Sequence, residues 1–227
     1  MNRAHYTATV EASHEELARL AGRFVVFEGP DGCGKTTQLG RLEHACKAAG
    51  VTLTRVREPG GTAVGEAVRQ ILLSKATDGL SMSAEMLLYM AARAQLVETV
   101  IRPALDRGEL VLADRFVPST LAYQGDAGGV RTDEIETIAR IATGGLAPDL
   151  VVLIDIDQST AAARLGSELD RIESRGSPFH RKVRQSYLSQ AKANPDRWVI
   201  VDGAGDESEV WERVLNAVMQ RIGSEHA

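Results

Sequence analysis

The hydrophobic positions of this chain fall into short apolar runs separated by longer segments of mixed polarity. Five runs of four to seven residues stand out, at 23–28, 52–56, 110–113, 150–156 and 198–201. Each is predicted to be a strand, and the runs at 23–28 and 110–113 suit strands that are buried on both faces.

Between these runs, apolar residues recur every three or four positions, which predicts helices over 39–49, 63–73, 83–105, 130–143, 160–165 and 207–222. Gly50 and Gly144 follow two of them as stop signals, and Pro103 should break or kink the longest. Strands that alternate with helices predict an α/β fold with a five-stranded, mostly parallel sheet and helices on both faces. No bounded helix is assigned in the charged stretch 167–184; for the polar residues up to 180, the residues alone favour a solvated charged helix.

The simplest partition is one domain over residues 22–223, because neither repeats nor a low-complexity linker divide the chain. Residues 1–21 precede the first strand, carry no core signal and are expected to be a dispensable extension with a disordered start. Within it, Ser13 and Glu16 have the spacing of a capping box for a short helix through Leu20.

A phosphate-binding loop lies between the first apolar run and the first long helix. Gly29-x-x-x-x-Gly34-Lys35-Thr36 matches the full motif, and the strand–loop–helix context supports it. The glycines let backbone N–H groups wrap an anion, and the helix that follows adds its positive end. Lys35 should reach the β- and γ-phosphates of a nucleotide, and the Thr36 hydroxyl should hold Mg²⁺. The predicted ATP-binding residues are Gly29, Pro30, Asp31, Gly32, Cys33, Gly34, Lys35, Thr36 and Thr37.

Composition narrows the class of protein further. The 227 residues carry a net charge of −5, which makes a nucleic-acid polymer a poor partner. Apolar runs are too short to span a membrane, and the start of the chain lacks an apolar signal core. The two cysteines, Cys33 and Cys46, would distort the loop if they were bridged, so reduced thiols and a cytoplasmic location are expected.

Polar residues that follow other strands decide what the bound nucleotide is used for. Asp114 and Arg115 end a buried strand, where a carboxylate suits contact with Mg²⁺ and a guanidinium suits a phosphate; a strand-end salt bridge is the alternative. Tyr89 and Arg93 share a helix face, as a base-stacking ring and an edge-reading cation would. Taken alone, that spacing is explained better by a core tyrosine and a surface arginine.

Six motifs occur in an order that resembles bacterial thymidylate kinases. They are Phe27-Glu-Gly-x-Asp-Gly-x-Gly-Lys-Thr-Thr37, Arg57-Glu-Pro-Gly-Gly-Thr62, Ala91-Ala-Arg-x-Gln95, Asp114-Arg-Phe-x-x-Ser-x-x-Ala-Tyr-Gln-Gly125, Pro148-Asp149 and Asp170-Arg-Ile-Glu173. The likeness runs from about residue 23 to residue 222. It implies a three-layer P-loop NTPase fold, ATP with Mg²⁺ as donor, dTMP as acceptor, dTDP and ADP as products, and a homodimer to which the helix over 83–105 contributes.

The resemblance also implies a role for each residue of the acceptor site. Tyr89 would stack on thymine, Arg93 would bond the base edge, and Ser119 and Thr120 would lie near the base. Tyr123 would press on the sugar where a 2′-hydroxyl would project, Asp31 would hold the 3′-hydroxyl, and Arg115 would hold the acceptor phosphate. Arg57 and Gln124 are weaker members of the same pocket.

Phosphoryl transfer requires that two polyanions be brought together, so Lys35, Mg²⁺ and arginines must supply positive charge. This loop has Gly32 and Cys33 where one branch of the family carries an arginine, so the chain resembles the branch whose arginines lie in a mobile lid, here about 164–180. The predicted catalytic residues are Lys35, Asp31, Arg115, Arg171 and Arg164; Arg175 is a further lid candidate, and Arg171 is the first choice. Arg171→Ala is expected to lower kcat far more than it weakens dTMP binding.

Two residues depart from the expected pattern. Phe116 stands where tyrosine or histidine is common, so a polar contact is lost there. Cys33 either faces the ligand, where thiol reagents would inactivate the enzyme and ATP would protect it, or fills a tight turn. Two other functions stay open at this stage: another P-loop kinase for a deoxynucleotide or deoxynucleoside, and a P-loop switch ATPase.

Overall fold

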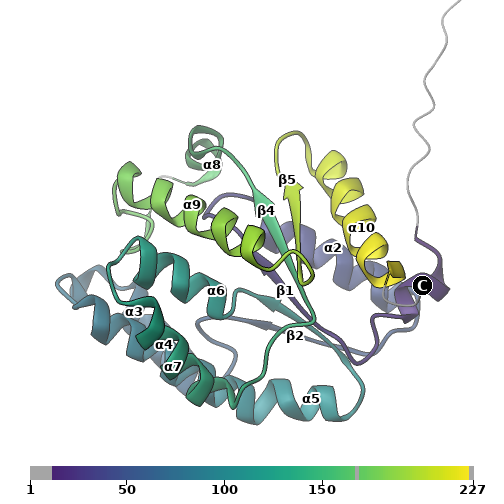
Figure 1. Cartoon of the computed structure of the whole chain (residues 1–227), viewed down its shortest axis with the longest axis horizontal. Helices are drawn as coiled ribbons and strands as arrows, with labels where there is room; N and C mark the ends of the chain where they lie inside the picture. The colour runs from purple at the N-terminus through teal and green to yellow at the C-terminus, as the bar shows by residue number, and fades with distance from the viewer. Residues whose placement is uncertain (1–11, 167–168, 225–227) are drawn as a thin grey trace, which may run out of the picture.

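The computed structural model describes residues 12–166 and 169–224, and it is built around one five-stranded sheet (Figure 1). All strand pairs are parallel, and the strand order is β2-β3-β1-β4-β5. The strands are β1 (Phe24–Glu28), β2 (Leu53–Arg57), β3 (Leu110–Asp114), β4 (Leu150–Asp155) and β5 (Trp198–Asp202). Each coincides with a predicted apolar run to within two residues, so the predicted α/β sheet is confirmed.

Helices cover both faces of the sheet and complete three layers. Alternate residues of β1 point to opposite faces: Val25 and Phe27 belong to one core cluster, and Phe24 and Val26 belong to the other. The first cluster is closed by α1 (His14–Ala18), α2 (Lys35–Ala48) and α10 (Glu207–Ser224). The second is closed by α4 (Met82–Leu96), α5 (Arg102–Asp106) and α9 (Ser177–Ala193).

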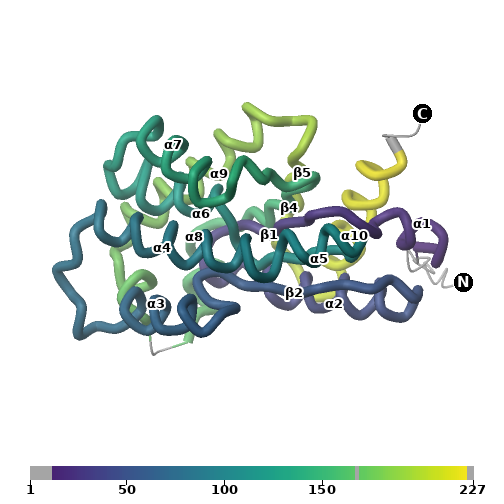
Figure 2. Tube along the Cα trace, turned by 90° about the horizontal axis from the view of Figure 1, so that it is seen from below, coloured from purple at the N-terminus to yellow at the C-terminus, as the bar shows by residue number. Residues whose placement is uncertain are grey.

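Two further helices pack on α4 rather than on the sheet. Val68 and Leu72 of α3 (Ala63–Leu73) contact one side of α4. Ile135 and Ala139 of α7 (Thr132–Thr143) contact Met86 and Met90. Figure 2 shows α3 and α4 side by side. The helix predicted to end at Gly144 does so, with the glycine in the left-handed conformation at φ 56°.

The helical stretch predicted over 83–105 is interrupted earlier than expected. Regular α-helix ends at Leu96, a wider π-turn covers Val97–Ile101, and α5 begins at Arg102. Pro103 lies in the first turn of α5, where a missing N–H costs least. The irregular turn therefore precedes the proline, and the interruption of the α-helix lies N-terminal to the predicted position.

Two α-helices of the described residues were not predicted. One is α6 (Val117–Thr120), which runs directly into the π-turn η3 (Leu121–Asp126). The other is α9, which begins within the charged stretch, extends to Ala193 and buries Val183, Tyr187 and Ala191 at four-residue spacing. Its remaining positions are mostly polar, so its apolar stripe is too narrow to stand out in the sequence. A short 3₁₀ turn over Lys75–Thr77 was not predicted either.

The N-terminal segment contributes to the core, contrary to the prediction. Ser13 and Glu16 form the expected capping box at the start of α1. Leu17 and Leu20, however, are buried in the cluster that contains α2 and α10. The expectation that this segment carries no core residue was therefore wrong for Leu17 and Leu20, and the predicted disordered start lies outside the described residues. Within residues 12–166 and 169–224, no helix is long and apolar enough to cross a membrane.

Candidate active site

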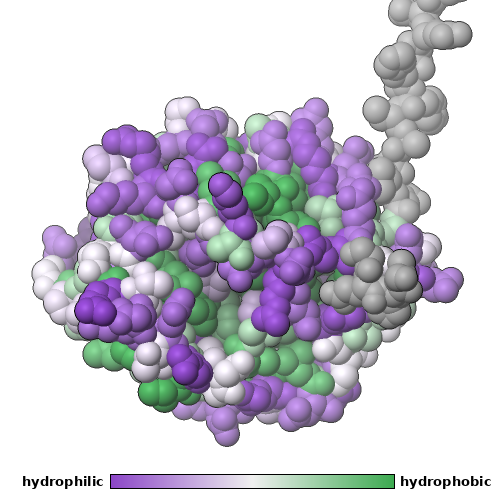
Figure 3. Space-filling model, viewed as in Figure 1, coloured by the Kyte–Doolittle hydropathy of each residue, from purple (hydrophilic) through white to green (hydrophobic). Residues whose placement is uncertain are grey.

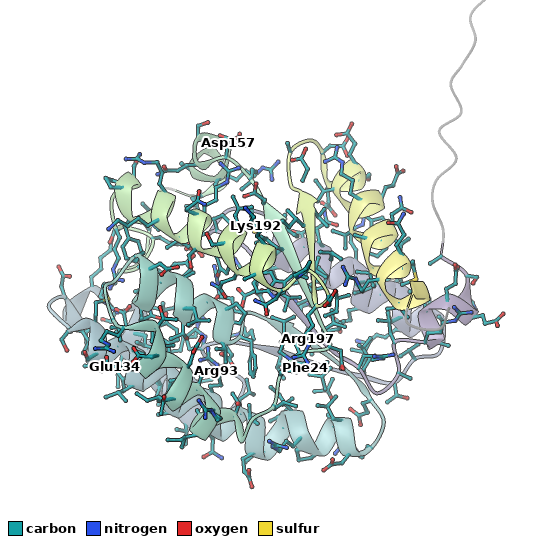
Figure 4. The ribbon with its side chains drawn as sticks, viewed as in Figure 1. Phe24, Arg93, Glu134, Asp157, Lys192 and Arg197 are labelled. Atoms are coloured by element: carbon teal, nitrogen blue, oxygen red, sulfur yellow. The ribbon has the colours of Figure 1, made fainter. Side chains whose placement is uncertain are left out.

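The phosphate-binding loop joins β1 to α2 and is shaped by three glycines with positive φ. A Cβ atom at Gly29 would lie 2.5 Å from the carbonyl oxygen of Ile154 on β4, and one at Gly32 would overlap the carbonyl oxygen of Ala161. Ala161 belongs to α8 (Gln158–Arg164), whose N-cap is Asp157 (Figure 4). The close approach of α8 therefore excludes a side chain at position 32, which explains why no arginine stands there.

The loop opens into a cavity of about 430 Å³ at the carboxyl ends of the strands, where ligands bind in such sheets. Most of the predicted site residues line it. They are Asp31, Gly32, Lys35, Thr36, Arg57, Tyr89, Asp114, Arg115, Ser119, Thr120, Tyr123 and Gln124. Arg93, Arg164 and Arg171 are not among the lining residues.

Thr36 and Asp114 meet at the floor of this cavity. The Thr36 hydroxyl donates to a carboxylate oxygen of Asp114 over 2.6 Å, which joins the start of α2 to the end of β3. A hydroxyl beside a carboxylate is a hard oxygen donor set of the kind that Mg²⁺ prefers. These two residues therefore fit the predicted metal site.

Asp31, Arg115 and Tyr123 form a cluster in the middle of the cavity. Both Arg115 and the Tyr123 hydroxyl donate to the Asp31 carboxylate, the latter over 2.7 Å. Lys35 Nζ lies 3.9 Å from the same carboxylate. Burial by itself would raise the pKa of Asp31, but Arg115 and then Lys35 outweigh it and hold the pKa at about 2. Asp31 is therefore an ionised hydrogen-bond acceptor at neutral pH.

Arg115 adopts a backbone conformation that is uncommon outside glycine, with φ at 75°. Its guanidinium is held by Ser119 Oγ at 3.0 Å and by the Tyr187 hydroxyl at 2.9 Å. Both hydroxyls also hydrogen-bond to Glu28 Oε2, a fully buried carboxylate at the end of β1. Burial raises the pKa of Glu28, against the opposing effect of Arg115.

Glu28 and Tyr187 were not identified as site residues from the sequence. Glu28 is the residue before the loop, so its place at a strand end was a usable signal. Tyr187 lies on α9, the helix that the sequence did not predict, and it reaches Arg115 from 72 residues away. Both residues orient the arginine rather than line the cavity.

At the far end of the cavity, Tyr89, Thr120 and Gln124 form a pocket with polar groups in its wall. Arg93 lies one layer behind this wall with 1% of its surface exposed (Figure 4). It pairs with buried Glu58 at 2.6 Å and donates to Thr120 Oγ1 at 3.1 Å. Burial raises the pKa of Glu58, and Arg93 opposes that effect. The structure therefore places Thr120, rather than Arg93, at the cavity surface.

Two arginines stand at the side of the cavity formed by β2 and α3. Arg57 pairs with Glu66 at 2.9 Å, and both side chains are partly exposed. Arg69 was not predicted; it lines the cavity and donates to the carbonyl of Pro59 over 3.0 Å. Burial and the neighbouring Arg57 lower the pKa of Arg69. Its position on the helix that follows the Arg57–Thr62 motif was the available sequence signal.

The predicted lid arginines make three different sets of contacts. Arg164 donates to the backbone carbonyls of Gly203 and Gly205, away from the cavity. Arg171, the first choice, is buried and bonds Leu72 O over 2.8 Å and the Glu85 carboxylate. Arg175 also binds Glu85, at 2.6 Å, and lines a second cavity of about 300 Å³ that includes Pro30 and Asp31 of the loop.

Cys33 does not face the ligand side of the loop. Its side chain is 1% exposed and packs in the core cluster with α2 and α10. Burial raises the pKa of its thiol, so the reactive thiolate is disfavoured. The structure therefore agrees with a residue that fills a tight turn, and both Cys33 and Cys46 are free thiols.

The parallel sheet, the phosphate-binding loop after β1 and the hydroxyl–carboxylate pair beside it define a P-loop phosphotransferase. Comparison with known proteins narrows this class. The family model described as thymidylate kinase matches residues 27–214. The chain belongs to the thymidylate kinase family.

Curated relatives and a solved structure agree with this assignment. The chain is 46% identical over 203 residues to a thymidylate kinase of Deinococcus radiodurans, covering 88% of this chain and 98% of the relative. It is 46% identical over 204 residues to a thymidylate kinase of Caldanaerobacter subterraneus, covering 89% of this chain and 98% of that relative. The crystal structure of a thymidylate kinase from Ehrlichia chaffeensis superposes with a TM-score of 0.70 at 31% identity, covering 86% of this chain and 98% of that one.

Proposed function

We propose that this protein is a thymidylate kinase that transfers the γ-phosphoryl group of ATP to the 5′-phosphate of dTMP, giving ADP and dTDP on the route to dTTP. The observation that carries the proposal is one cavity whose lining includes two chemically different sets of groups. One set is Lys35, Thr36 and Asp114 of the phosphate-binding loop and β3, and the other is the aromatic and amide groups of Tyr89 and Gln124. A donor and an acceptor nucleotide can therefore meet within it.

At the donor end, Lys35 would neutralise the β- and γ-phosphates, and Thr36 and Asp114 would hold Mg²⁺. When bound with ATP, the metal supplies charge compensation for the transferred group. The acceptor phosphate is already an anion at neutral pH, so the reaction needs no strong general base. This chain's residues act mainly by positioning the two anions and neutralising their charge.

At the acceptor end, Tyr89 would stack on the base, and Thr120 would read its polar edge. The Thr120 hydroxyl already accepts from Arg93, so its own proton is free to be donated to a ligand carbonyl. Arg93 would thus act on the base edge through Thr120. Ser119 would support this wall of the pocket from its bond to Glu28.

In the middle of the cavity, ionised Asp31 would accept the hydrogen bond of the 3′-hydroxyl. Tyr123, which donates to Asp31, would press on the sugar carbon that carries no hydroxyl in a deoxynucleotide. Arg115 would bind the acceptor phosphate, with Arg57 and Arg69 as further cations at the same cavity. This sequence of groups matches base, sugar and phosphate in order.

The segment 164–180 is proposed to act as the lid. Among its arginines, Arg175 is best placed for the transferring phosphoryl group because it shares a cavity with the loop residues Pro30 and Asp31. Arg171 is instead committed to Leu72 and Glu85, so we assign it to holding the lid on the domain.

The chain is also proposed to form a homodimer through α3 and α4. These neighbouring helices expose large apolar side chains at Val64 and Ile71 on α3 and at Leu87 on α4. Leu87→Glu should convert the dimer to a monomer in sedimentation experiments; a monomeric unmodified protein would contradict this interface. A cytoplasmic location remains the expectation, in keeping with the two free thiols.

The proposed reaction is tested by ADP release from ATP with dTMP, dUMP, thymidine or no acceptor. Release should be fast with dTMP and negligible without an acceptor. Preference for thymidine would indicate a deoxynucleoside kinase. Strong release without any acceptor would instead favour a switch ATPase and contradict the proposal.

A further inference from the structure

Glu85 is a buried carboxylate that the proposed mechanism does not use. It lies on α4, one turn before Tyr89, with none of its surface exposed. Three side chains from distant segments donate to it: Arg171, Arg175 and Gln124. Both arginines bond its Oε2 atom, and the amide nitrogen of Gln124 donates to Oε1 over 2.8 Å.

The two guanidinium groups determine what Glu85 can do. With both on one oxygen, the carboxylate is negatively charged and can only accept hydrogen bonds. The side-chain amide of its partner Gln124 has an NH₂ group that donates hydrogen bonds and a carbonyl oxygen that accepts them. Gln124 must therefore turn its NH₂ group toward Glu85, whichever way its amide is drawn.

Gln124 lines the acceptor cavity, whereas Glu85 lies behind it. With Nε2 turned to Glu85, the amide end left for the cavity is the carbonyl Oε1. Beside it, Thr120 has a proton to donate because its oxygen accepts from Arg93. The wall thus offers an acceptor next to a donor, each fixed by a buried ion behind it.

We propose that Glu85 is a specificity-determining positioning residue, which fixes the Gln124 amide so that the pocket accepts the N3–H of a pyrimidine-2,4-dione and rejects a 4-aminopyrimidine. Thymine and uracil present a carbonyl beside N3–H, which complements this wall. Cytosine presents an amino group beside an unprotonated N3. Its amino group would face the Thr120 donor and its N3 would face the Gln124 carbonyl, so neither hydrogen bond could form. This inference rests on the proposed function of the same cavity.

Glu85→Gln tests the proposal. The oxygen of the new amide would turn to the arginines and its NH₂ group to Gln124, so Gln124 would rotate and present NH₂ to the cavity. The acceptors to compare are dTMP and 5-methyl-dCMP, which differ only at the N3–C4 edge. We expect the ratio of kcat/KM for dTMP to kcat/KM for 5-methyl-dCMP to fall about tenfold or more. The kcat/KM for dUMP should fall together with that for dTMP.

A merely structural role predicts a different result. If Glu85→Gln lowers kcat/KM for dTMP, dUMP and 5-methyl-dCMP by the same factor, the proposal is overturned. Glu43→Gln is the matched control, because Glu43 also accepts from two basic side chains, Lys47 and Arg55, but lies on α2 away from the cavity. Its substrate ratio should stay unchanged.

Gln124→Leu keeps the test valid if Glu85→Gln does not fold. It removes the amide and leaves both arginine pairs of Glu85, and it should also reduce the preference for dTMP about tenfold. An unchanged preference would overturn the proposal. In the double variant, Glu85→Gln should not change the preference further. An unmodified protein that shows no dTMP-dependent ADP release would instead refute the proposed function, so the two failures are distinguishable.

Discussion

Asp31 connects the two halves of the site. It belongs to the phosphate-binding loop, yet its carboxylate is bonded by Arg115, which follows β3, and by Tyr123 of η3. Its place in the loop motif was evident from the sequence, and so was the strand-end position of Arg115. Their contact was not, because it joins residues 84 positions apart.

The lowered pKa of Asp31 predicts a specific dependence of stability on pH. Because its pKa is about 2 in the folded protein, against 3.8 ordinarily, the ionised form stabilises the fold above about pH 4. This contribution, on the order of 2 kcal/mol, is lost as the pH falls from about 4 toward 2. Asp31→Asn should remove it, so the difference in unfolding free energy between the two proteins should shrink with falling pH.

Urea titrations of both proteins at a series of pH values measure this difference. Asn keeps the size of the side chain and removes its charge. A difference in unfolding free energy that is constant from pH 6 to the acid limit of the native state would show that Asp31 has an ordinary pKa.

At the scale of elements, the sequence predicts best where a single pattern decides the structure. All five strands follow from apolar runs, and α7 ends at Gly144 as its glycine requires. The π-turn over Val97–Ile101 has no such pattern, because it has the same composition as ordinary helix. Helix α9 was missed because three buried apolar positions in a mostly polar segment leave only a faint periodicity.

The contribution of the N-terminal segment to the core was likewise not predicted from the sequence pattern, and it can be tested. Leu20 is fully buried against the α2 and α10 layer, although it lies outside the repeating pattern of strands and helices. Leu20→Ala should cost about 2–4 kcal/mol of unfolding free energy because it leaves a cavity in the core. The exposed neighbour Arg19→Ala serves as control and should change stability by less than about 0.5 kcal/mol.

Chemical denaturation of the two variants and the unmodified protein gives these values. If Leu20→Ala and Arg19→Ala have equal, small effects, the segment is dispensable for the core, as the sequence first suggested.

At the scale of the whole molecule, strand order brings the chemistry together. Because β1 lies beside β3 in the sheet, the loop after β1 lies next to the Asp114–Arg115 pair at the carboxyl end of β3. Figure 3 shows mainly polar residues around apolar patches on one face of the molecule. The motifs predicted a set of site residues, most of which line one cavity, but they did not predict which partner each would take.

The arginines illustrate why the hydrogen-bond partners of site residues could not be predicted from the sequence. Arg171 was the leading candidate for the transferring phosphoryl group, yet it binds Glu85 from 86 positions away. A guanidinium takes whichever anion the fold brings near, and only the packed structure decides that. Motif spacing alone therefore could not separate Arg171, which is buried against Glu85, from Arg175, which shares a cavity with loop residues.

The proposed transfer of phosphoryl from ATP to dTMP can be followed directly with ATP labelled in its γ-phosphate. The protein is incubated with this ATP, Mg²⁺ and dTMP, and the products are separated by chromatography. The label should appear in the β-phosphate of dTDP, and Lys35→Ala should abolish its transfer. Label released as inorganic phosphate, at a rate that dTMP does not change, would contradict the proposed transfer.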